Sequence, residues 1–595
     1  MGLLQKAVET YDSHCIYASQ NREGQEVMAP VGHIITRAGI EIVLDQDGKF
    51  QSASAVDKAE PKIIIPATEN SAGRTSAPCP HPLCEQIGYL LPRNKLKYQL
   101  FIDQLSTWVN SPCSHPKLLP VLQYVKGETI LSDLERCKLM KPTEKDIQDK
   151  EKLLIRWRIL GEEQEACWLD RSLFDAFTKY YLASQRGTEG LCMITGNDGI
   201  IAAQHPKGIV SLKGNAKLIS ANDTSGFTYR GRFTEETQAL TISYEASQKA
   251  HNALRWLVDT QGVRATFGGR TFLCWNPQGR LMILPHLPFM RAPEPIFEPS
   301  NYREELQKAL NGKKAKLELS DGVVLAAFDA ATTGRLSLTY YNELMGHDFL
   351  QRLHDWDAAC CWPHRNFGIQ SPSLRQIVDC AFGTQRNGRM ETDDRVLRQQ
   401  MQRLIACRID GNLLGADIIK NLTDRASHPQ AYDQYVWESI LFTACAVIRK
   451  YKMDRFKEEW NMALEPERKD RSYQFGRLLA VMEKVERDTY GSGESREPNA
   501  IRLQSMFCRR PMQTAANLEK QLERAYYPRL KPGSRNWYKN LSGQILEMIS
   551  TFPEEEWNKP LDSTYLMGYY LQRTALYPKK TDNDMEEEEN DGTEE

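Results

Sequence analysis

The hydrophobic pattern of the chain changes near residue 374, and this change limits the folds that it can adopt. Before it, short apolar runs are separated by turns rich in Gly, Asn, Asp and Pro, which is typical of short strands. After it, apolar residues recur every three to four positions through residue 576, as in amphipathic helices. We therefore predict an α+β fold, mixed and mainly β in its N-terminal and central regions, followed by an all-α helical bundle.

A chain of 595 residues exceeds one ordinary hydrophobic core, so we predict several folded regions. They are an N-terminal α/β region (1–130), a central strand-rich region (131–373), the C-terminal helical bundle (374–580) and an acidic tail that we expect to be disordered (581–595). Without the nine acidic residues of the tail, the net charge of −2 becomes +7. The body of the protein is therefore basic.

Local patterns predict individual elements. A short helix begins the chain, and alternating residues predict a strand over 39–45 that ends at the Asp47-Gly48 turn. Apolar positions at helical spacing predict a helix over 94–110. Further strands are expected at 62–66, at 152–159, at 271–275 paired with 281–284, and at 323–328 paired with 335–340.

The central stretch, residues 192–257, combines tight turns with cationic and small polar side chains. Its apolar pairs (193–194, 200–201 and 218–219) are separated by Thr-Gly, Asn-Asp-Gly and Lys-Gly-Asn, which favours strands joined by turns. Backbone N–H groups at such turns can meet an anionic ligand. The local sequence pairs no nucleophile with a base, so the stretch favours binding over catalysis.

This stretch resembles the large subunit of type I-C CRISPR surveillance complexes (Cascade). The shared landmarks follow one order along the chain: Cys192-x-Ile-Thr-Gly196, His205-Pro206, Lys213-Gly214, Ser220-Ala-Asn222 and Ser243-Tyr244. Further matches extend the resemblance to both ends: Arg74-Thr-Ser76, Gln86-x-Gly-Tyr-Leu90, the segment from Phe475 to Glu483, and Met567-Gly-Tyr-Tyr-Leu-Gln-Arg573. The chain departs from the family in having Glu85-Gln86 in place of Asp-Asn, which is one methylene longer at each position.

The resemblance implies a DNA-binding subunit, and not an enzyme, of an RNA-guided antiviral ribonucleoprotein. Such a subunit binds foreign double-stranded DNA, recognises a short flanking motif (the PAM), aids duplex opening and stabilises the R-loop. The implied partners are a crRNA-containing complex, a multi-copy backbone subunit, a guide-processing subunit and a recruited helicase-nuclease that cuts the DNA. The resemblance also implies a small subunit translated from an internal start in the C-terminal region, for which Met462 is the candidate.

Three groups of residues are candidate nucleic-acid contacts. The N-terminal loop offers side chains able to read base edges or phosphates, unless they merely begin a turn: Arg74, Thr75, Ser76 and Gln86. The central turns offer contacts to duplex phosphates: Lys207, Lys213, Asn215, Lys217, Asn222 and Arg230. The helical region offers single-strand-binding cations interleaved with aromatic residues, unless those rings belong to the core: Arg509, Arg510, Arg524, Arg529, Lys531 and Arg535.

Two alternatives involve a metal ion. A zinc-stabilised RNA-binding scaffold could take its ligands from Cys79, His81, Cys84, Cys113 and His115, although the cluster has no Cys-x-x-Cys pair. A stand-alone metal-dependent nuclease could use Asp355 and Asp357, unless these carboxylates cap a helix or pair with Arg352 or Arg365.

Several function classes have no support in the sequence. There is no phosphate-binding loop, no His-Glu-x-x-His and no Gly-x-Ser-x-Gly, and we expect no cofactor. No apolar run is long enough to span a membrane, and the first residues lack the pattern of a secretory signal. We therefore expect a cytoplasmic protein whose 14 cysteines are reduced thiols.

Overall fold

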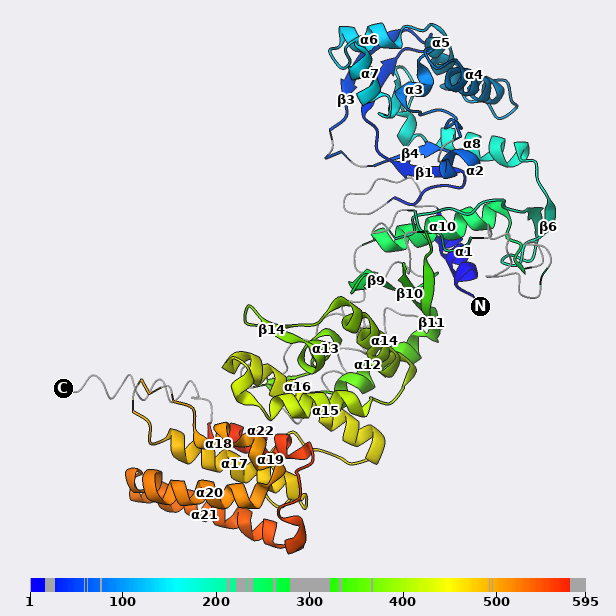
Figure 1. Cartoon of the computed structure of the whole chain (residues 1–595). Coiled ribbons are helices and arrows are strands. Elements are labelled where there is room, and N and C mark those ends of the chain that lie inside the picture. Colours follow the sequence, from blue (N-terminus) through cyan, green and yellow to red (C-terminus); the bar gives the residue numbers. More distant parts are fainter. Residues whose placement is uncertain are drawn as a thin grey trace. The chain divides into compact units, whose positions relative to one another are not determined.

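The computed structural model describes residues 2–15, 27–57, 59–60, 62–74, 77–210, 215–220, 233, 239–260, 264–278, 322–330, 334–364, 368–491, 493–494 and 496–577. Helices and small sheets alternate before residue 374 and helices dominate after it, which confirms the α+β class (Figure 1). The chain divides into two compact units. The first is Met1–Leu284 with Asp321–Glu343, and the second is Pro285–Ser320 with Leu344–Glu595.

A three-stranded sheet forms the N-terminal core of the first unit. β2 (Ile40–Leu44) lies between β3 (Phe50–Ala55) and β5 (Ile155–Ile159); it is antiparallel to β3 and parallel to β5. The predicted turn joins β2 to β3, and Gly48 has a φ of +77° there, which a residue with a Cβ rarely adopts. β1 (His33–Thr36) pairs separately with β4 (Ile63–Pro66).

Helices cover this core and confirm the helix predicted over 94–110. Asn94 caps α4 by accepting a hydrogen bond from the Lys97 N–H at 3.1 Å. Trp108 of α4 and Trp157 of β5 are fully buried between the helices and the sheet. The helices are α2 (Glu69–Gly73), α3 (Ile87–Leu90), α4 (Lys95–Val109), α5 (Leu118–Lys126), α6 (Ile130–Arg136), α7 (Glu144–Lys150) and α8 (Arg171–Ser184).

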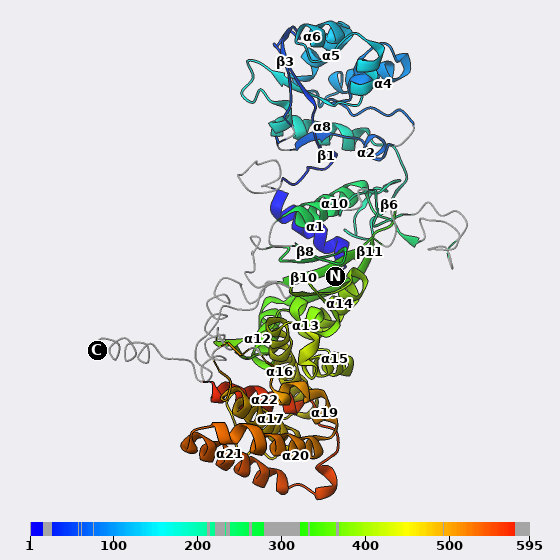
Figure 2. The ribbon, with the colours of Figure 1, turned by 60° about the vertical axis from the view of Figure 1, so that its left-hand side comes forward.

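A second core in the same unit joins the first helix to strands far along the chain. α1 (Leu3–His14) packs against α10 (Tyr244–Asp259), and both views show them side by side (Figures 1 and 2). Below them lies a four-stranded sheet, in which the Trp275 indole N–H donates to Thr10 Oγ1 at 2.9 Å. The strand order is β11 (Ser337–Met345), β10 (Gly322–Asp329), β9 (Arg270–Trp275) and β8 (Arg264–Phe267).

The sheet confirms part of the predicted pairing. β10 and β11 are neighbours, as the hairpin at 323–340 requires. β9 is paired on both edges, with β8 and β10, whereas residues 281–284, its predicted partner, lie outside the described residues.

The central turns contain fewer strands than predicted. β6 (Glu189–Leu191) and β7 (Asp198–Ile200) form a short antiparallel pair, and residues 193–194 lie in the turn between them. Residues 218–219 follow an isolated bridge at Lys217 and form no strand. Two apolar residues give too little pattern to distinguish a strand from a turn with buried side chains.

The predicted region boundaries do not coincide with the two compact units. The boundary at residue 130 separates β2 from β5, which are hydrogen-bonded in one sheet. The boundary at residue 373 separates α12 (Gly346–Ala359) from the helices that it contacts, α14 (Asp394–Asp410) and α16 (Gln434–Phe456). Both mismatches arise because packing between distant segments is invisible to local composition.

The second unit is mainly helical, and its two family motifs meet at a close helix crossing. A Cβ at Gly476 of α17 (Arg471–Arg487) would overlap the Tyr565 carbonyl, and a Cβ at Gly568 of α22 (Thr564–Leu576) would overlap the Tyr473 carbonyl. Glycine therefore lets the two backbones touch. The other helices are α13 (Leu374–Phe382), α15 (Ala416–Ala426), α18 (Asn499–Arg502), α19 (Gln504–Arg509), α20 (Pro511–Gln521) and α21 (Pro532–Ser550).

The C-terminal region is not entirely α-helical. β14 (Thr384–Arg386) and β15 (Arg389–Glu391) form a hairpin whose turn residues, Asn387 and Gly388, have φ values of 47° and 72°. β12 (Trp362–His364) and β13 (Gly368–Gln370) form another two-stranded pair in this unit. Among the described residues, no helix is long and apolar enough to cross a membrane. The predicted acidic tail lies outside the described residues.

Candidate nucleic-acid interface

The N-terminal loop is organised by an ion pair between Arg74 and Glu85. The two guanidinium nitrogens Nη1 and Nη2 of Arg74 donate to the two carboxylate oxygens at 2.5 and 2.8 Å, and Nη1 also donates to the Cys79 carbonyl. Glu85 is fully buried and accepts two more hydrogen bonds, from the backbone N–H groups of His81 and Gln86. Burial works against the charge on Arg74, but the hydrogen bond and charge of Glu85 outweigh it and raise the pKa of the guanidinium.

These contacts distinguish the four residues of the N-terminal loop that were predicted to contact the flanking motif. Arg74 holds the loop, because its bidentate pair with Glu85 occupies the donors that a base contact would use. Gln86 is half-buried, and its side-chain amide has no hydrogen-bond partner in the part of the chain that the structure describes. Thr75 and Ser76 lie outside the described residues. Gln86 is thus the described side chain of this group whose donors and acceptor are not engaged by other described residues.

The central turns bring two predicted lysines together. Lys207 and Lys217 are partners in an isolated antiparallel bridge, and Lys217 is also bridged to Arg335. Residues directly opposite in such a bridge project on the same side, where like charges repel. The Glu69 carboxylate already interacts with Lys217, and an anion between the two lysines would offset the repulsion that remains. Asn215 is exposed nearby, whereas Lys213, Asn222 and Arg230 lie outside the described residues.

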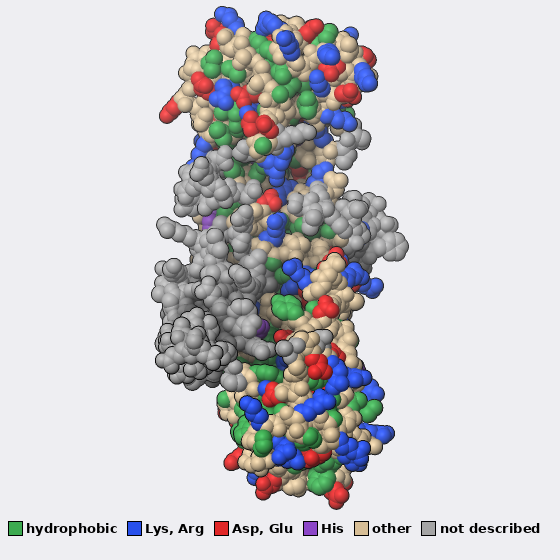
Figure 3. All heavy atoms as spheres, turned by 90° about the vertical axis from the view of Figure 1, so that its left-hand side faces the viewer, with side chains coloured by type: hydrophobic (Ala, Val, Ile, Leu, Met, Phe, Trp, Pro, Cys, Tyr) green, Lys and Arg blue, Asp and Glu red, His purple; other side chains and the backbone are tan. Residues whose placement is uncertain are grey.

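The C-terminal cations form the most strongly charged surface of the three groups. Figure 3 shows Lys and Arg side chains gathered over the C-terminal helices, at the bottom of the view. Five predicted residues are exposed and Arg535 is half-buried. Within the described ranges, no carboxylate pairs with any of them. The six residues are Arg509, Arg510, Arg524, Arg529, Lys531 and Arg535.

The aromatic residues between these cations belong mostly to the core. Tyr526, Tyr527 and Tyr538 are buried, so they offer no face to a ligand. Trp537, on α21, is 52% exposed and is the ring that a single strand can reach. Of the four rings predicted to interleave with the cations, three are therefore in the core and one is exposed, since periodicity alone does not say which face of a helix is covered.

The structure adds cations that sequence reasoning missed. Arg335 is exposed beside the bridged lysines, and Arg502 of α18 and Lys520 of α20 are exposed on helices next in sequence to those of the C-terminal group. The segment from Asn499 to Ser550 contains nine Lys and Arg residues and three Glu residues. This excess of positive charge was the sequence signal that could have pointed to Arg502 and Lys520.

The residues of the two metal alternatives are engaged elsewhere. His81 Nδ1 lies 3.0 Å from Ser71 Oγ and His115 Nε2 lies 3.1 Å from Ser172 Oγ, so the two histidines point into separate contacts. Over the described ranges, no three His, Cys, Asp or Glu side chains gather as metal ligands would.

The two aspartates of the nuclease alternative also differ in environment. Asp357 is buried and accepts two hydrogen bonds from Arg408 Nη2, at 2.8 and 2.9 Å. Asp355 is exposed and accepts a hydrogen bond from Gln351 Nε2 at 2.8 Å. A metal centre needs both carboxylates directed at one point. The arrangement instead supports a structural role for Asp357.

The comparison with known families bears on the whole chain. A search of curated proteins found no significant match. A family model described as "CRISPR-associated protein (Cas_Csd1)" matches residues 14–577, which cover most of both compact units and all three groups of candidate contacts. This match supports the expectation of a CRISPR-associated, Cascade-type protein. On this evidence, the chain belongs to the Cas_Csd1 family of CRISPR-associated proteins.

Proposed function

We propose that the chain is the large, DNA-binding subunit of a type I-C Cascade complex. In this role it binds foreign double-stranded DNA, recognises the PAM, aids duplex opening and stabilises the R-loop, while the guide RNA reads sequence by base pairing. The observation that carries the proposal is the array of six cations in the C-terminal helical region of a CRISPR-associated chain, none of which pairs with a carboxylate among the described residues. Such an array suits a displaced single strand, whose phosphates need charge neutralisation.

Each group of contacts has a distinct part in the proposal. Gln86 reads a base edge of the flanking motif from a loop that Arg74 and Glu85 hold in place. Lys207 and Lys217 hold a phosphate of the duplex. The C-terminal cations follow the displaced strand. In this arrangement the chain is not an enzyme, and a recruited helicase-nuclease cuts the DNA.

The remaining partners follow from the same proposal. The chain joins a crRNA, a multi-copy backbone subunit and a guide-processing subunit in the cytoplasm. Met462 lies between α16 and α17, so a product started there carries α17 and all later helices, including the six cations. We propose that this product is the small subunit of the complex.

Binding to duplexes with randomised flanks, with and without the guide-RNA complex and at two salt concentrations, tests the proposal. Gln86→Ala is expected to abolish flank preference while leaving the salt dependence unchanged. Lys217→Ala is expected to weaken binding evenly across flanks and to flatten the salt dependence. Gln99→Ala, on the exposed face of α4, is the control and is expected to change neither.

Two results would contradict the proposal. Binding that ignores the flanks while the complex stays assembled would make the chain a scaffold. Cleavage of DNA by the purified chain with Mg²⁺ or Mn²⁺, lost in Asp355→Ala, would favour the nuclease alternative.

A further inference from the structure

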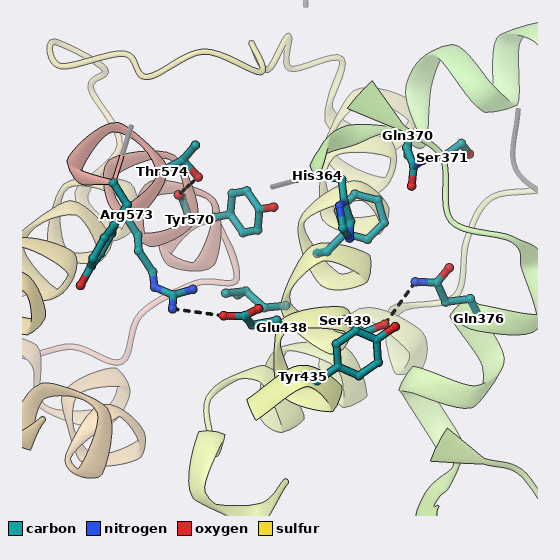
Figure 4. Close-up of a pocket in the computed structure, with 13 residues that line it drawn as sticks. His364, Gln370, Ser371, Gln376, Tyr435, Glu438, Ser439, Tyr570, Arg573 and Thr574 are labelled. Carbon is teal, nitrogen blue, oxygen red and sulfur yellow. Dashed lines mark hydrogen bonds and ion pairs between the residues drawn. The ribbon is translucent and has the colours of Figure 1, made fainter. Parts of the chain in front are cut away.

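The second unit contains a cavity of about 260 Å³ that none of the roles above uses. Its walls come from the β12–β13 pair, from α13, from α16 and from α22. Figure 4 shows Tyr570 of α22 pointing toward His364 of β12, with Tyr435 of α16 below them in the view, beside Ser439. Pockets for drug-sized ligands begin at roughly 300 Å³, so this cavity suits a single ring system.

Aromatic side chains line the cavity from several directions. Tyr435 is 79% exposed, more than any other large apolar side chain in the described part of the chain. The rings of His364 and Phe442 meet edge to face, with centroids 5.1 Å apart, which fixes the orientation of His364. A large ring left open to water at the mouth of a cavity is a platform on which a flat ligand can stack.

The polar groups of the cavity favour hydrogen bonding over charge. Gln370 has a side-chain amide with no hydrogen-bond partner over the described ranges. Gln376 Nε2 donates to Ser439 and Thr443, which leaves its carbonyl oxygen to accept. The two charged groups, Arg573 and Glu438, form an ion pair with each other at 3.3 Å. A neutral ligand with donors and acceptors at its edge therefore fits better than a phosphate.

We propose that this cavity holds one unpaired nucleobase of a single-stranded nucleic acid. The base stacks on Tyr435, and its edge bonds to the amides of Gln370 and Gln376, while the phosphates stay outside. A phenylalanine ring has no donor or acceptor at its edge and an indole has a single N–H, so neither meets two amides as the edge of a nucleobase does. The inference rests on the proposed function, because it takes the displaced DNA strand as the source of the base.

The test uses the full-length chain and a single-stranded oligonucleotide that carries one 2-aminopurine, a fluorescent base quenched by stacking. Tyr435→Ala is expected to abolish the quenching and to lower the affinity for the oligonucleotide about fivefold or more, the effect of losing one stacked base. Gln370→Ala is expected to weaken binding without abolishing the quenching. An oligonucleotide with an abasic site at the same position is expected to bind the native chain and Tyr435→Ala equally well.

Phe456→Ala is the matched control, because Phe456 lies at the other end of α16, is 52% exposed and does not line the cavity. It is expected to leave both signals unchanged. Equal quenching and affinity in the native chain and in Tyr435→Ala would overturn the inference. It would also be overturned if a tryptophan peptide displaced the bound base and an excess of nucleoside monophosphate did not. DNA and RNA versions of the probe distinguish the displaced strand from the guide.

The two proposals fail in different ways. If the complex prefers certain flanks but no 2-aminopurine position is quenched, the cavity is not a base site and the proposed function stands. If quenching depends on Tyr435 but flank preference is absent, the base site stands and the proposed function fails.

Discussion

Replacing Arg74 with alanine is expected to loosen the N-terminal loop by leaving Glu85 as a buried, unpaired charge. Removing one partner of a buried ion pair costs about 3–5 kcal/mol. Glu85 keeps hydrogen bonds from two backbone N–H groups, at 2.5 and 2.6 Å, which places the cost near the lower limit. A cost of ~3 kcal/mol corresponds to a local opening constant raised on the order of 100-fold.

Hydrogen exchange of the loop peptides measures this opening directly. Amides over residues 77–91 are expected to lose protection on the order of 100-fold in Arg74→Ala, whereas amides of α17 are expected to be unchanged. Arg93→Ala is the matched control, because Arg93 pairs with Glu144 on the surface, where such a pair contributes about 0–1 kcal/mol. The double variant Arg74→Ala/Glu85→Gln is expected to regain part of the protection, since it carries no buried unpaired charge but has one amide oxygen for the two backbone N–H groups.

The reasoning is refuted if Arg74→Ala and Arg93→Ala show the same exchange. It is also refuted if Arg74→Ala keeps full protection but loses flank preference. That second result would make Arg74 a direct base reader, contrary to its placement against Glu85.

Three further predictions concern other parts of the molecule. Arg524→Ala should weaken single-strand binding for every sequence and reduce the slope of log affinity against log salt concentration by roughly 0.7, as an anisotropy titration measures. Arg403→Ala removes a cation that is paired with Asp417 and should change neither quantity. Gly568→Ala should separate α17 from α22, lower the free energy of unfolding of the second unit by about 1–3 kcal/mol and lower its unfolding temperature. Gly543→Ala should change neither, because the space around a Cβ at Gly543 is open. Burial lowers the pKa of His81 to about 4 from 6.5, so the unfolded chain takes up the proton first as the pH falls. The free energy of opening of the loop should therefore be at its maximum above about pH 6.5 and should fall by up to ~3 kcal/mol toward pH 4. The variant His81→Phe should remove this dependence on pH.

Local signals predicted local structure well. The Asp47-Gly48 turn and the helix capped by Asn94 were found where the pattern placed them. The hairpin at β14 and β15 was missed although Asn387-Gly388 is a strong turn signal, because strands of three residues show too little alternation. Parallel pairing of β2 with β5 could not be predicted, since no local pattern records a partner more than a hundred residues away.

The candidate site shows the same limit. The basic composition of the C-terminal helices was visible in the sequence, and five of the six predicted cations are exposed. The role of Arg74 was not visible, because it depends on a carboxylate that only the folded loop brings within 2.5 Å. Likewise, the burial of Tyr526 and Tyr527 depends on how neighbouring helices pack.

The contact between α1 and the strand that carries Trp275 has a consequence for synthesis of the protein. Thr10 and Trp275 are separated by 265 positions, and a ribosome adds about 5–20 residues per second. Leu3, Ala7 and Tyr11 therefore emerge tens of seconds before the surfaces that cover them are made. During that interval the apolar face of α1 lacks the strands that later cover it, so it is open to any chaperone that binds exposed apolar segments.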